Sequence, residues 1–295
     1  DMVFHPRLAA EDLEAEREAG LPEISDMAAR ALVRANRAIL RGRAADAAAA
    51  TAAADSNAAT AAALGFDAVE LFLPGADFVS VAEVRILAER HGLAIAAVGT
   101  GAGWLRQGLS LTDASEENRE AALEFVFSMI DFGGELGAPA ILGSMQGRGA
   151  SPQSRDHLVA GLRRCADRAA KHGVPFIYEP LNRYETLLCN RLGDAAEFLD
   201  LHALTNVVLL ADLFHMNIEE TDLPAAFRAA GKHVGHVHFA DSNRQAMGFG
   251  HIDSRSIIAA LREIGYDGYL SAEILPLPDP GTAARQTIAV IRSLT

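Results

Sequence analysis

Four acidic or histidine side chains stand near the ends of four separate apolar runs in this sequence. The runs PFIYEP, NVVLLAD, VGHVHFA and GYLSAEI contain, in this order, Glu179, Asp212, His238 and Glu273. Three carboxylates and one imidazole suit Mn²⁺, Co²⁺ or Mg²⁺ better than a metal that seeks thiolates. This set of side chains therefore predicts one divalent metal site, provided that the fold brings the four run ends together.

Each of these residues also has an ordinary structural interpretation. A single Asp or Glu at the end of a strand is commonly a turn residue or a helix N-cap. His236 and His238 lie two residues apart in an apolar run, so they face the same side, and a single histidine there is more often a hydrogen-bonded core residue. The coincidence of four such residues on four runs favours the metal site.

Other polar residues follow the same runs. For Glu185, His215 and Arg244 a contact with substrate is favoured over a solvated turn. Asn182, Asp241 and Asn243 are explained equally well by turns, because Asn and Asp side chains bond to their own backbone there. The stretch GTGAGW at 99–104 is a weak nucleotide motif, since GxGxxG is not completed. Its position after an apolar run makes Trp104 available to pack on a sugar.

The apolar runs alternate with amphipathic stretches from about residue 59 onward. The runs cover residues 67–73, 93–99, 138–144, 175–180, 206–212, 234–240 and 268–274. They are apolar on both faces, which indicates parallel strands covered on both sides. Repeated strand–helix units predict a parallel sheet, either doubly wound or closed as a (β/α)₈ TIM barrel. In a barrel the C-terminal strand ends, and hence the four candidate ligands, converge on one face.

The N-terminal part fits this pattern poorly. An eight-stranded barrel needs one more strand before residue 59, and only MVFH at residues 2–5 resembles one. Residues 44–64 are close to low complexity. We therefore expect an atypical N-terminal segment over residues 1–58 and a TIM-barrel catalytic domain over residues 59–295. Whether the N-terminal segment contains the first strand and a helix is left open.

Composition excludes several classes of function. The formal net charge is −13 and no block of Lys and Arg occurs, which argues against binding to nucleic acid. No apolar run approaches the roughly 20 residues that span a bilayer, and the first residues contain no apolar signal-peptide segment. The two cysteines, Cys165 and Cys189, have no metal-binding spacing. We expect a soluble, cytoplasmic protein that does not bind membranes.

Several longer motifs resemble one family. EPLNRYET, LLADLFHMNIEE, HVHFADSNR and GYLSAEILPLP are similar to the ketose 3-epimerases of the xylose-isomerase-like barrel superfamily, the D-tagatose and D-psicose 3-epimerase group. GTGAGWLRQGLSLTD, the GRG stretch at 147–149 and GHIDSRSI resemble most closely the 5-keto-L-gluconate epimerases. The resemblance covers residues 59–295 and not the N-terminal segment, where the family carries its first strand.

The resemblance implies a metal-dependent isomerase that inverts the carbon next to a ketone. In this reading Glu179, Asp212, His238 and Glu273 hold one divalent cation, typically Mn²⁺ or Co²⁺. Glu179 and Glu273 are also the two acid/base groups, because epimerisation removes a proton from one face and returns one to the other. Glu185, His215 and Arg244 match positions that bind substrate. The relatives are dimers or tetramers, so a homo-oligomer is expected.

The substrate is expected to be a small sugar or sugar acid. For a keto acid such as 5-keto-L-gluconate, Arg148 is a candidate partner of the carboxylate, and a solvated loop residue is the equal alternative. An aldose–ketose or hydroxypyruvate-type isomerase on the same barrel is the second interpretation. A DNA-repair endonuclease is disfavoured by the acidic balance, and a non-enzymatic sugar-binding or scaffold protein is a fourth possibility.

Overall fold

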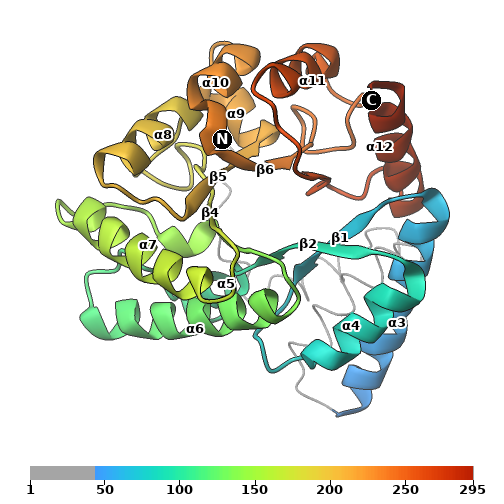
Figure 1. Ribbon diagram of the computed structural model, residues 1–295, viewed down its shortest axis with the longest axis horizontal. Coiled ribbons are helices and arrows are strands. Elements are labelled where there is room, and N and C mark those ends of the chain that lie inside the picture. Colours follow the sequence, from blue (N-terminus) through green and yellow to red (C-terminus); the bar gives the residue numbers. More distant parts are fainter. Residues whose placement is uncertain (1–43, 295) are drawn as a thin grey trace, which may run out of the picture.

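The computed structural model describes residues 44–294, and this part of the chain contains seven parallel strands in one sheet (Figure 1). Each strand pairs with the next one along the chain, so the spatial order is the sequence order. The strands are β1 Ala68–Phe72, β2 Ala94–Gly99, β3 Ala140–Leu142, β4 Phe176–Tyr178, β5 Val207–Asp212, β6 Val234–His238 and β7 Leu270–Ser271. All seven predicted runs contain a strand, and the sheet curls into a nearly closed barrel, which confirms the TIM-barrel prediction over a doubly wound sheet.

Helices surround the strands on the outside of the barrel (Figure 1). They are α3 Ala44–Leu64, α4 Val81–His91, α5 Ala102–Gln107, α6 Glu116–Glu135, α7 Ser154–Ala170, α8 Leu192–Leu201, α9 Leu213–Glu219, α10 Leu223–Ala230, α11 Ser254–Glu263 and α12 Pro280–Leu294. Two short 3₁₀ turns are also present: η1 Ser144–Gln146 follows β3, and η2 Gly231–His233 precedes β6. Within residues 44–294 no helix is both long and apolar enough to cross a membrane.

The turns that lead from helix to strand share a glycine in the left-handed backbone region. In this region a side chain is strained and glycine is not, so glycine ends the helix and redirects the chain. Five glycines that each lie between a helix and the next strand have positive φ: Gly65, Gly92, Gly137, Gly173 and Gly265. The same glycine turn therefore recurs in five of the strand–helix units.

Side chains that face the barrel interior form two successive layers. Ala97, Ile141, Ile177 and Leu210, from β2 to β5, form a buried apolar cluster. Because side chains two residues apart lie on the same face of a strand, Glu179 and Asp212 follow Ile177 and Leu210 into the next layer. The pairing of β5 with β6 sets Leu210 beside His236 and Asp212 beside His238. The polar layer thus lies at the C-terminal end of the barrel, directly above an apolar one.

The barrel edge between β1 and β7 bears on the N-terminal prediction. Among the described strands β1 pairs only with β2 and β7 only with β6, so no eighth strand lies in residues 44–294. The candidate first strand at residues 2–5 lies outside the described residues. Helix α3 contacts α4 and α12, and its Asp55 bonds to Arg90 and His91 at the end of α4. The expected boundary at residue 58 falls within α3, and the division of the chain stays a prediction.

Candidate metal and acid/base site

The structure brings the four predicted metal ligands together at the C-terminal end of the barrel. Glu179 directly follows β4, while Asp212 and His238 are the last residues of β5 and β6. Glu273 lies two residues beyond β7, which is shorter than the predicted run 268–274. One ligand atom from each of the four residues lies within 4.8 Å of all the others.

His238 lies at the centre of this group. Its Nδ1 is 3.2 Å from Asp212 Oδ2 and 3.3 Å from Glu273 Oε2. The same nitrogen is 3.9 Å from Glu179 Oε1. Three carboxylate oxygens thus surround one imidazole nitrogen, which is the donor set that a hard or borderline divalent cation prefers.

Whether a cation fits this group can be judged from which carboxylate oxygens already have a hydrogen-bond partner. Among the described residues Glu179 Oε1 is one of three buried side-chain atoms without a hydrogen-bond partner, and a buried oxygen of this kind costs free energy unless something satisfies it. Asp212 uses Oδ1 to accept the backbone N–H groups of Phe214 and His215. Its Oδ2 faces the other three ligands. The orphaned oxygen and the inward Oδ2 both fit a bound cation.

The ligand carboxylates differ in their affinity for protons. Burial raises the pKa of Glu179 well above its usual value, and the nearby negative charges of Glu273 and Asp212 raise it further. These effects outweigh the charge of His238, which acts to lower the pKa. Burial also acts to raise the pKa of Asp212, but the interactions of its carboxylate with His215 and His238 outweigh this effect, and the net shift is downward.

Glu273 shows the opposite balance from Glu179. Its side chain is 46% exposed. Burial of its remaining part acts to raise its pKa, but the hydrogen bond and charge of His238, together with the charge of Arg244, lower it. The pKa values of the two carboxyls predicted as acid/base groups are therefore shifted in opposite directions.

His215 points one ring nitrogen at Glu179. Asn182 donates from its side-chain amide to His215 Nδ1 at 2.7 Å, and this bond makes Nδ1 an acceptor. The proton is then on Nε2, which lies 3.7 Å from Glu179 Oε1. Asn182 also donates to Glu185 Oε1 at 3.1 Å. The predicted substrate residues Glu185 and His215 thus share one partner, Asn182, beside the metal ligands.

Arg244 approaches the site from the loop after β6. Its Nη2 donates to Glu273 Oε2 at 2.6 Å, and its guanidinium lies 4.9 Å from the centre of the Phe214 ring. The residue has a φ of 59°, a conformation that is uncommon outside glycine. Asp241 is fully buried and accepts the backbone N–H groups of Ser242, Gly248 and Ile252, which folds the loop that carries Arg244.

Of the last two predicted substrate residues, Trp104 lies on a short helix and Arg148 lies on a loop. Trp104 is on α5, half-buried and packed against the main core. Arg148 is exposed, and its Nη1 donates to the backbone oxygen of Tyr184 at 2.7 Å. The backbone oxygen of Arg148 accepts from Leu187. This residue therefore joins the loop after β3 to the loop that contains Glu185.

Two polar residues near the site were not singled out by the sequence analysis. Gln146 is fully buried and donates to the backbone oxygens of Gly143 and Glu179, while Tyr178 donates to its Oε1. Glu70, on β1, faces His236 and His238. A signal for Glu70 was present in the sequence, because a glutamate inside the apolar run DAVELFL must find a partner when it is buried.

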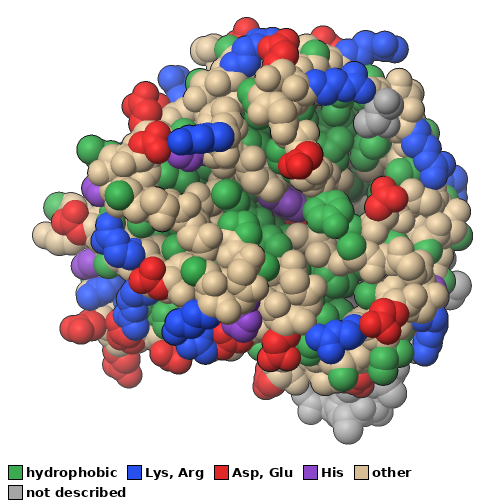
Figure 2. Space-filling view, in the orientation of Figure 1, with side chains coloured by type: hydrophobic (Ala, Val, Ile, Leu, Met, Phe, Trp, Pro, Cys, Tyr) green, Lys and Arg blue, Asp and Glu red, His purple; other side chains and the backbone are tan. Residues whose placement is uncertain are grey.

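The surface agrees with a small-molecule site. Figure 2 shows a hollow near the centre of one face, with hydrophobic and histidine side chains in it. Acidic and basic side chains alternate around the edge of this face, and no continuous basic surface lies on it. This is the surface expected from a net charge of −13.

Comparisons with known proteins agree with this geometry. The chain is 31% identical over 245 residues to 3-dehydro-D-guloside 4-epimerase of Escherichia coli strain K12, covering 78% of this chain and 90% of that protein. It is 37% identical over 145 residues to L-ribulose 3-epimerase of Methylomonas sp. strain DH-1, covering 49% of this chain and 51% of that protein. The crystal structure of D-allulose 3-epimerase from Methylomonas sp. superposes with a TM-score of 0.74 at 28% identity, covering 83% of this chain and 93% of that one.

These three relatives are all named as epimerases. The family model described as xylose isomerase-like TIM barrel matches residues 58–294, which include all seven strands of the barrel. The chain belongs to the xylose isomerase-like TIM barrel family.

Proposed function

We propose that this protein is a divalent-metal-dependent epimerase that inverts the carbon next to the carbonyl of a ketose or a keto-sugar acid. The observation that carries the proposal is the group of four ligands at the ends of four strands, with the buried Glu179 Oε1 left without a partner. The relatives support the reaction class, since one is an L-ribulose 3-epimerase and another a 3-dehydro-D-guloside 4-epimerase.

Glu179, Asp212, His238 and Glu273 would hold the cation. The donor set favours Mn²⁺, with Co²⁺ or Mg²⁺ as alternatives. When bound, the cation supplies a positive charge that stabilises negative charge on the substrate's carbonyl oxygen.

Two carboxylates on separate strands explain how the carbon would be inverted. The proton next to the carbonyl leaves from one face, giving a planar cis-enediolate, and a proton returns from the other face. Glu179 after β4 and Glu273 after β7 approach from different strands, so each can serve one face. One acts as base and the other as acid, and the roles exchange in the reverse direction.

The remaining polar residues would bind and orient the substrate. His215 presents an Nε2–H near Glu179, and Arg244 presents its guanidinium beside Glu273. Both donors suit the carbonyl and hydroxyl oxygens of a sugar. Glu185 offers an acceptor for hydroxyl groups, and Trp104 offers an apolar ring surface at the end of β2.

The substrate class is the finer part of the proposal. A ketose inverted at C3 and a keto acid such as 5-keto-L-gluconate or D-tagaturonate are the two candidates. A keto acid carries a carboxylate that needs a cationic partner, and Arg148 on the loop after β3 is the candidate for it. A cytoplasmic location and a homo-oligomer, dimer or tetramer, complete the proposal.

Replacing Arg148 separates these two substrate classes. With Arg148→Ala, kcat/KM for 5-keto-L-gluconate should fall about 10- to 100-fold, the size of a lost charge-assisted hydrogen bond. A neutral ketose serves as the control for damage to the loop, because Arg148 also bonds to Tyr184. An unchanged kcat/KM for the keto acid would remove Arg148 from the binding site.

An epimerisation assay tests the function itself. The protein is stripped of metal with a chelator, reloaded with Mn²⁺, and incubated with D-tagatose, D-psicose, L-ribulose and 5-keto-L-gluconate in parallel. We expect epimerisation of at least one of these, and none before reloading. Formation of an aldose instead would favour the isomerase interpretation.

A further inference from the structure

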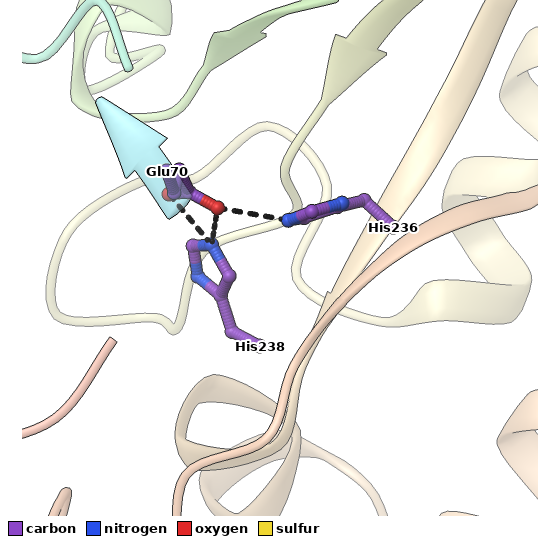
Figure 3. Close-up of side chains that lie close together, drawn as sticks. All are labelled: Glu70, His236 and His238. Atoms are coloured by element: carbon purple, nitrogen blue, oxygen red, sulfur yellow. Dashed lines mark hydrogen bonds and ion pairs between the residues drawn. The ribbon is translucent and has the colours of Figure 1, made fainter. Parts of the chain in front are cut away.

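The carboxylate of Glu70 reaches across the barrel interior and contacts the proposed metal ligand His238. Glu70 is on β1 and His238 is on β6, strands that do not pair with each other. Glu70 Oε1 is 3.2 Å from His238 Nε2, and Glu70 Oε2 is 2.9 Å from His236 Nε2. Figure 3 shows the carboxylate between the two rings, with both ring nitrogens pointing at it.

The two nitrogens of His238 thus face different partners. Nδ1 faces Asp212, Glu273 and the orphaned oxygen of Glu179. In the part of the chain that the structure describes, Nε2 lies within hydrogen-bond distance of Glu70. A neutral imidazole has one lone pair and one N–H, so the side with the lone pair is the side that can bind a cation.

The trio of Glu70, His236 and His238 could itself be taken for a second metal site, because its ligand atoms lie close together. This reading requires His238 to give lone pairs from both nitrogens, which a neutral ring cannot do. The Nδ1 side offers three carboxylates, whereas the Nε2 side offers one carboxylate and one other histidine. The donors therefore favour a single cation on the Nδ1 side.

We propose that Glu70 is a positioning residue that fixes the tautomer and orientation of His238. Its carboxylate accepts the Nε2–H of His238. When a cation takes the place of the proton that Nδ1 shares with Asp212 and Glu273, the ring would be neutral and the lone pair on Nδ1 would be directed at the cation. The proposal rests on the metal site of the proposed function, and it adds a residue that does not touch the cation or the substrate. Outer carboxylates of this kind orient metal-binding histidines in many proteins.

His236 holds Glu70 in the required place. Because a carboxylate accepts and does not donate, it can take one N–H from each histidine at the same time. The ring of His236 lies edge-on to that of His238, with the centres 5.5 Å apart. His236 therefore acts on the cation only through Glu70 and then His238, and its replacement should have a smaller effect than that of Glu70.

Binding of Mn²⁺ without substrate tests this role. For Glu70→Ala, titration calorimetry should give a Kd for Mn²⁺ about 10- to 100-fold weaker than that of the unaltered protein, the usual effect of losing such a partner. Glu70→Gln should give a smaller loss, because its amide oxygen can still accept from His238 while its amide nitrogen faces His236. Glu197→Gln, on the exposed side of α8, is the matched control and should bind Mn²⁺ normally.

The tautomer of His238 in the unaltered protein provides a second readout, which can be measured even if a Glu70 variant does not fold. In ¹H–¹⁵N NMR spectra of the Mg²⁺-loaded protein, His238 should show a protected Nε2–H, and this signal should vanish in Glu70→Ala. A purely structural role for Glu70 would lower the melting temperature while leaving the Kd for Mn²⁺ unchanged.

The outcomes separate this inference from the proposed function. An Nδ1–H tautomer of His238 in the Mg²⁺-loaded protein, two metal ions per chain, or an unchanged Kd in Glu70→Ala would each overturn the role of Glu70. If Glu179→Gln still lowered Mn²⁺ affinity in that case, the metal site and the proposed function would stand. If the unaltered protein bound no Mn²⁺, both would fail.

Discussion

At the scale of single residues, the carboxyl groups of Glu179 and Glu273 have two proposed duties, metal binding and proton transfer. Replacing either by Gln keeps an oxygen that can face the cation but removes the group that accepts a proton. We expect kcat to fall about 10²- to 10⁴-fold in each variant, the usual contribution of a positioned acid or base. Steady-state kinetics with saturating Mn²⁺ measure this effect.

The same pair of variants separates the two duties. Loss of the proton-transfer role should lower kcat even when calorimetry shows that Mn²⁺ is fully bound. Glu197→Gln removes the same charge from the exposed side of α8 and should keep full activity. Near-normal kcat in either site variant at full metal occupancy would show that the residue is not an acid or base.

At the scale of elements, the end of β3 controls the position of Glu179. Gly143 directly follows β3, and a Cβ at this position would overlap the carboxylate of Glu179. Gly143→Ala should therefore displace a metal ligand and lower kcat about 10²-fold, the scale of a misplacement of about 1 Å. The measurement is kcat together with Mn²⁺ affinity, and both are expected to fall.

A second glycine provides the control for Gly143. At Gly193, in the first turn of α8, an added Cβ would lie 3.7 Å from Ala229 Cβ, an ordinary contact. Gly193→Ala should leave activity unchanged. Full activity in Gly143→Ala would mean that the loop after β3 moves aside and that its close approach to Glu179 is not required for activity.

The sequence predicted these elements because each strand of a parallel barrel is covered on both faces. The uninterrupted apolar runs of these strands were therefore visible without a structure. The strand ends were less clear. Glu273 lies beyond a strand of two residues, Leu270–Ser271, although the apolar run GYLSAEI suggested a longer one.

Glu70 shows what a single sequence does not reveal. It lies 166 residues before His236, and only the closure of the barrel brings the two side chains together. Local periodicity indicates which face a residue occupies, but it does not say which residue stands opposite across the barrel. For the same reason the bond from Arg148 to Tyr184, between two loops, could not be foreseen.

At the scale of the whole molecule, an ion-pair cluster joins two outer helices. Asp131 on α6 accepts hydrogen bonds from Arg168 on α7, and His172 beyond α7 lies 2.9 Å from the same carboxylate. The hydrogen bonds from Arg168 lower the pKa of Asp131, with a further contribution from His172 against the opposing effect of burial. The folded state therefore holds this carboxylate ionised at a lower pH than the unfolded chain does.

The direction of this shift sets how stability depends on pH. The contribution of Asp131 is fully present above its unfolded pKa of about 3.9 and is lost as pH falls through the lower pKa of the folded state. Asp131→Asn should cost about 1 kcal/mol of unfolding free energy near neutral pH, and this difference should shrink as the pH falls below the unfolded pKa. Asp167→Asn, exposed on α7, is the control. A difference that grows in acid would contradict the assignment.

Metal binding should stabilise the barrel as a whole, because its ligands come from four strands. A cation present at about 100 times its Kd adds about 2.7 kcal/mol to the folded state, provided that the unfolded chain does not bind it. For a domain of this size the melting temperature should rise by about 5 to 11 °C. Scanning calorimetry with Mn²⁺ and with EDTA measures the shift, and equal melting temperatures would speak against a metal site built from separate strands.

The central claim, inversion at the carbon next to a carbonyl with two glutamates on opposite faces, is tested most directly in D₂O. The Mn²⁺-loaded protein is incubated there with the ketose or keto acid that it converts, and the products are analysed by NMR. We expect one deuterium at the inverted carbon, with the carbonyl unmoved, and loss of this exchange on the affected face in Glu179→Gln or Glu273→Gln. Deuterium on the neighbouring carbon with a shifted carbonyl, or inversion without any deuterium, would contradict it.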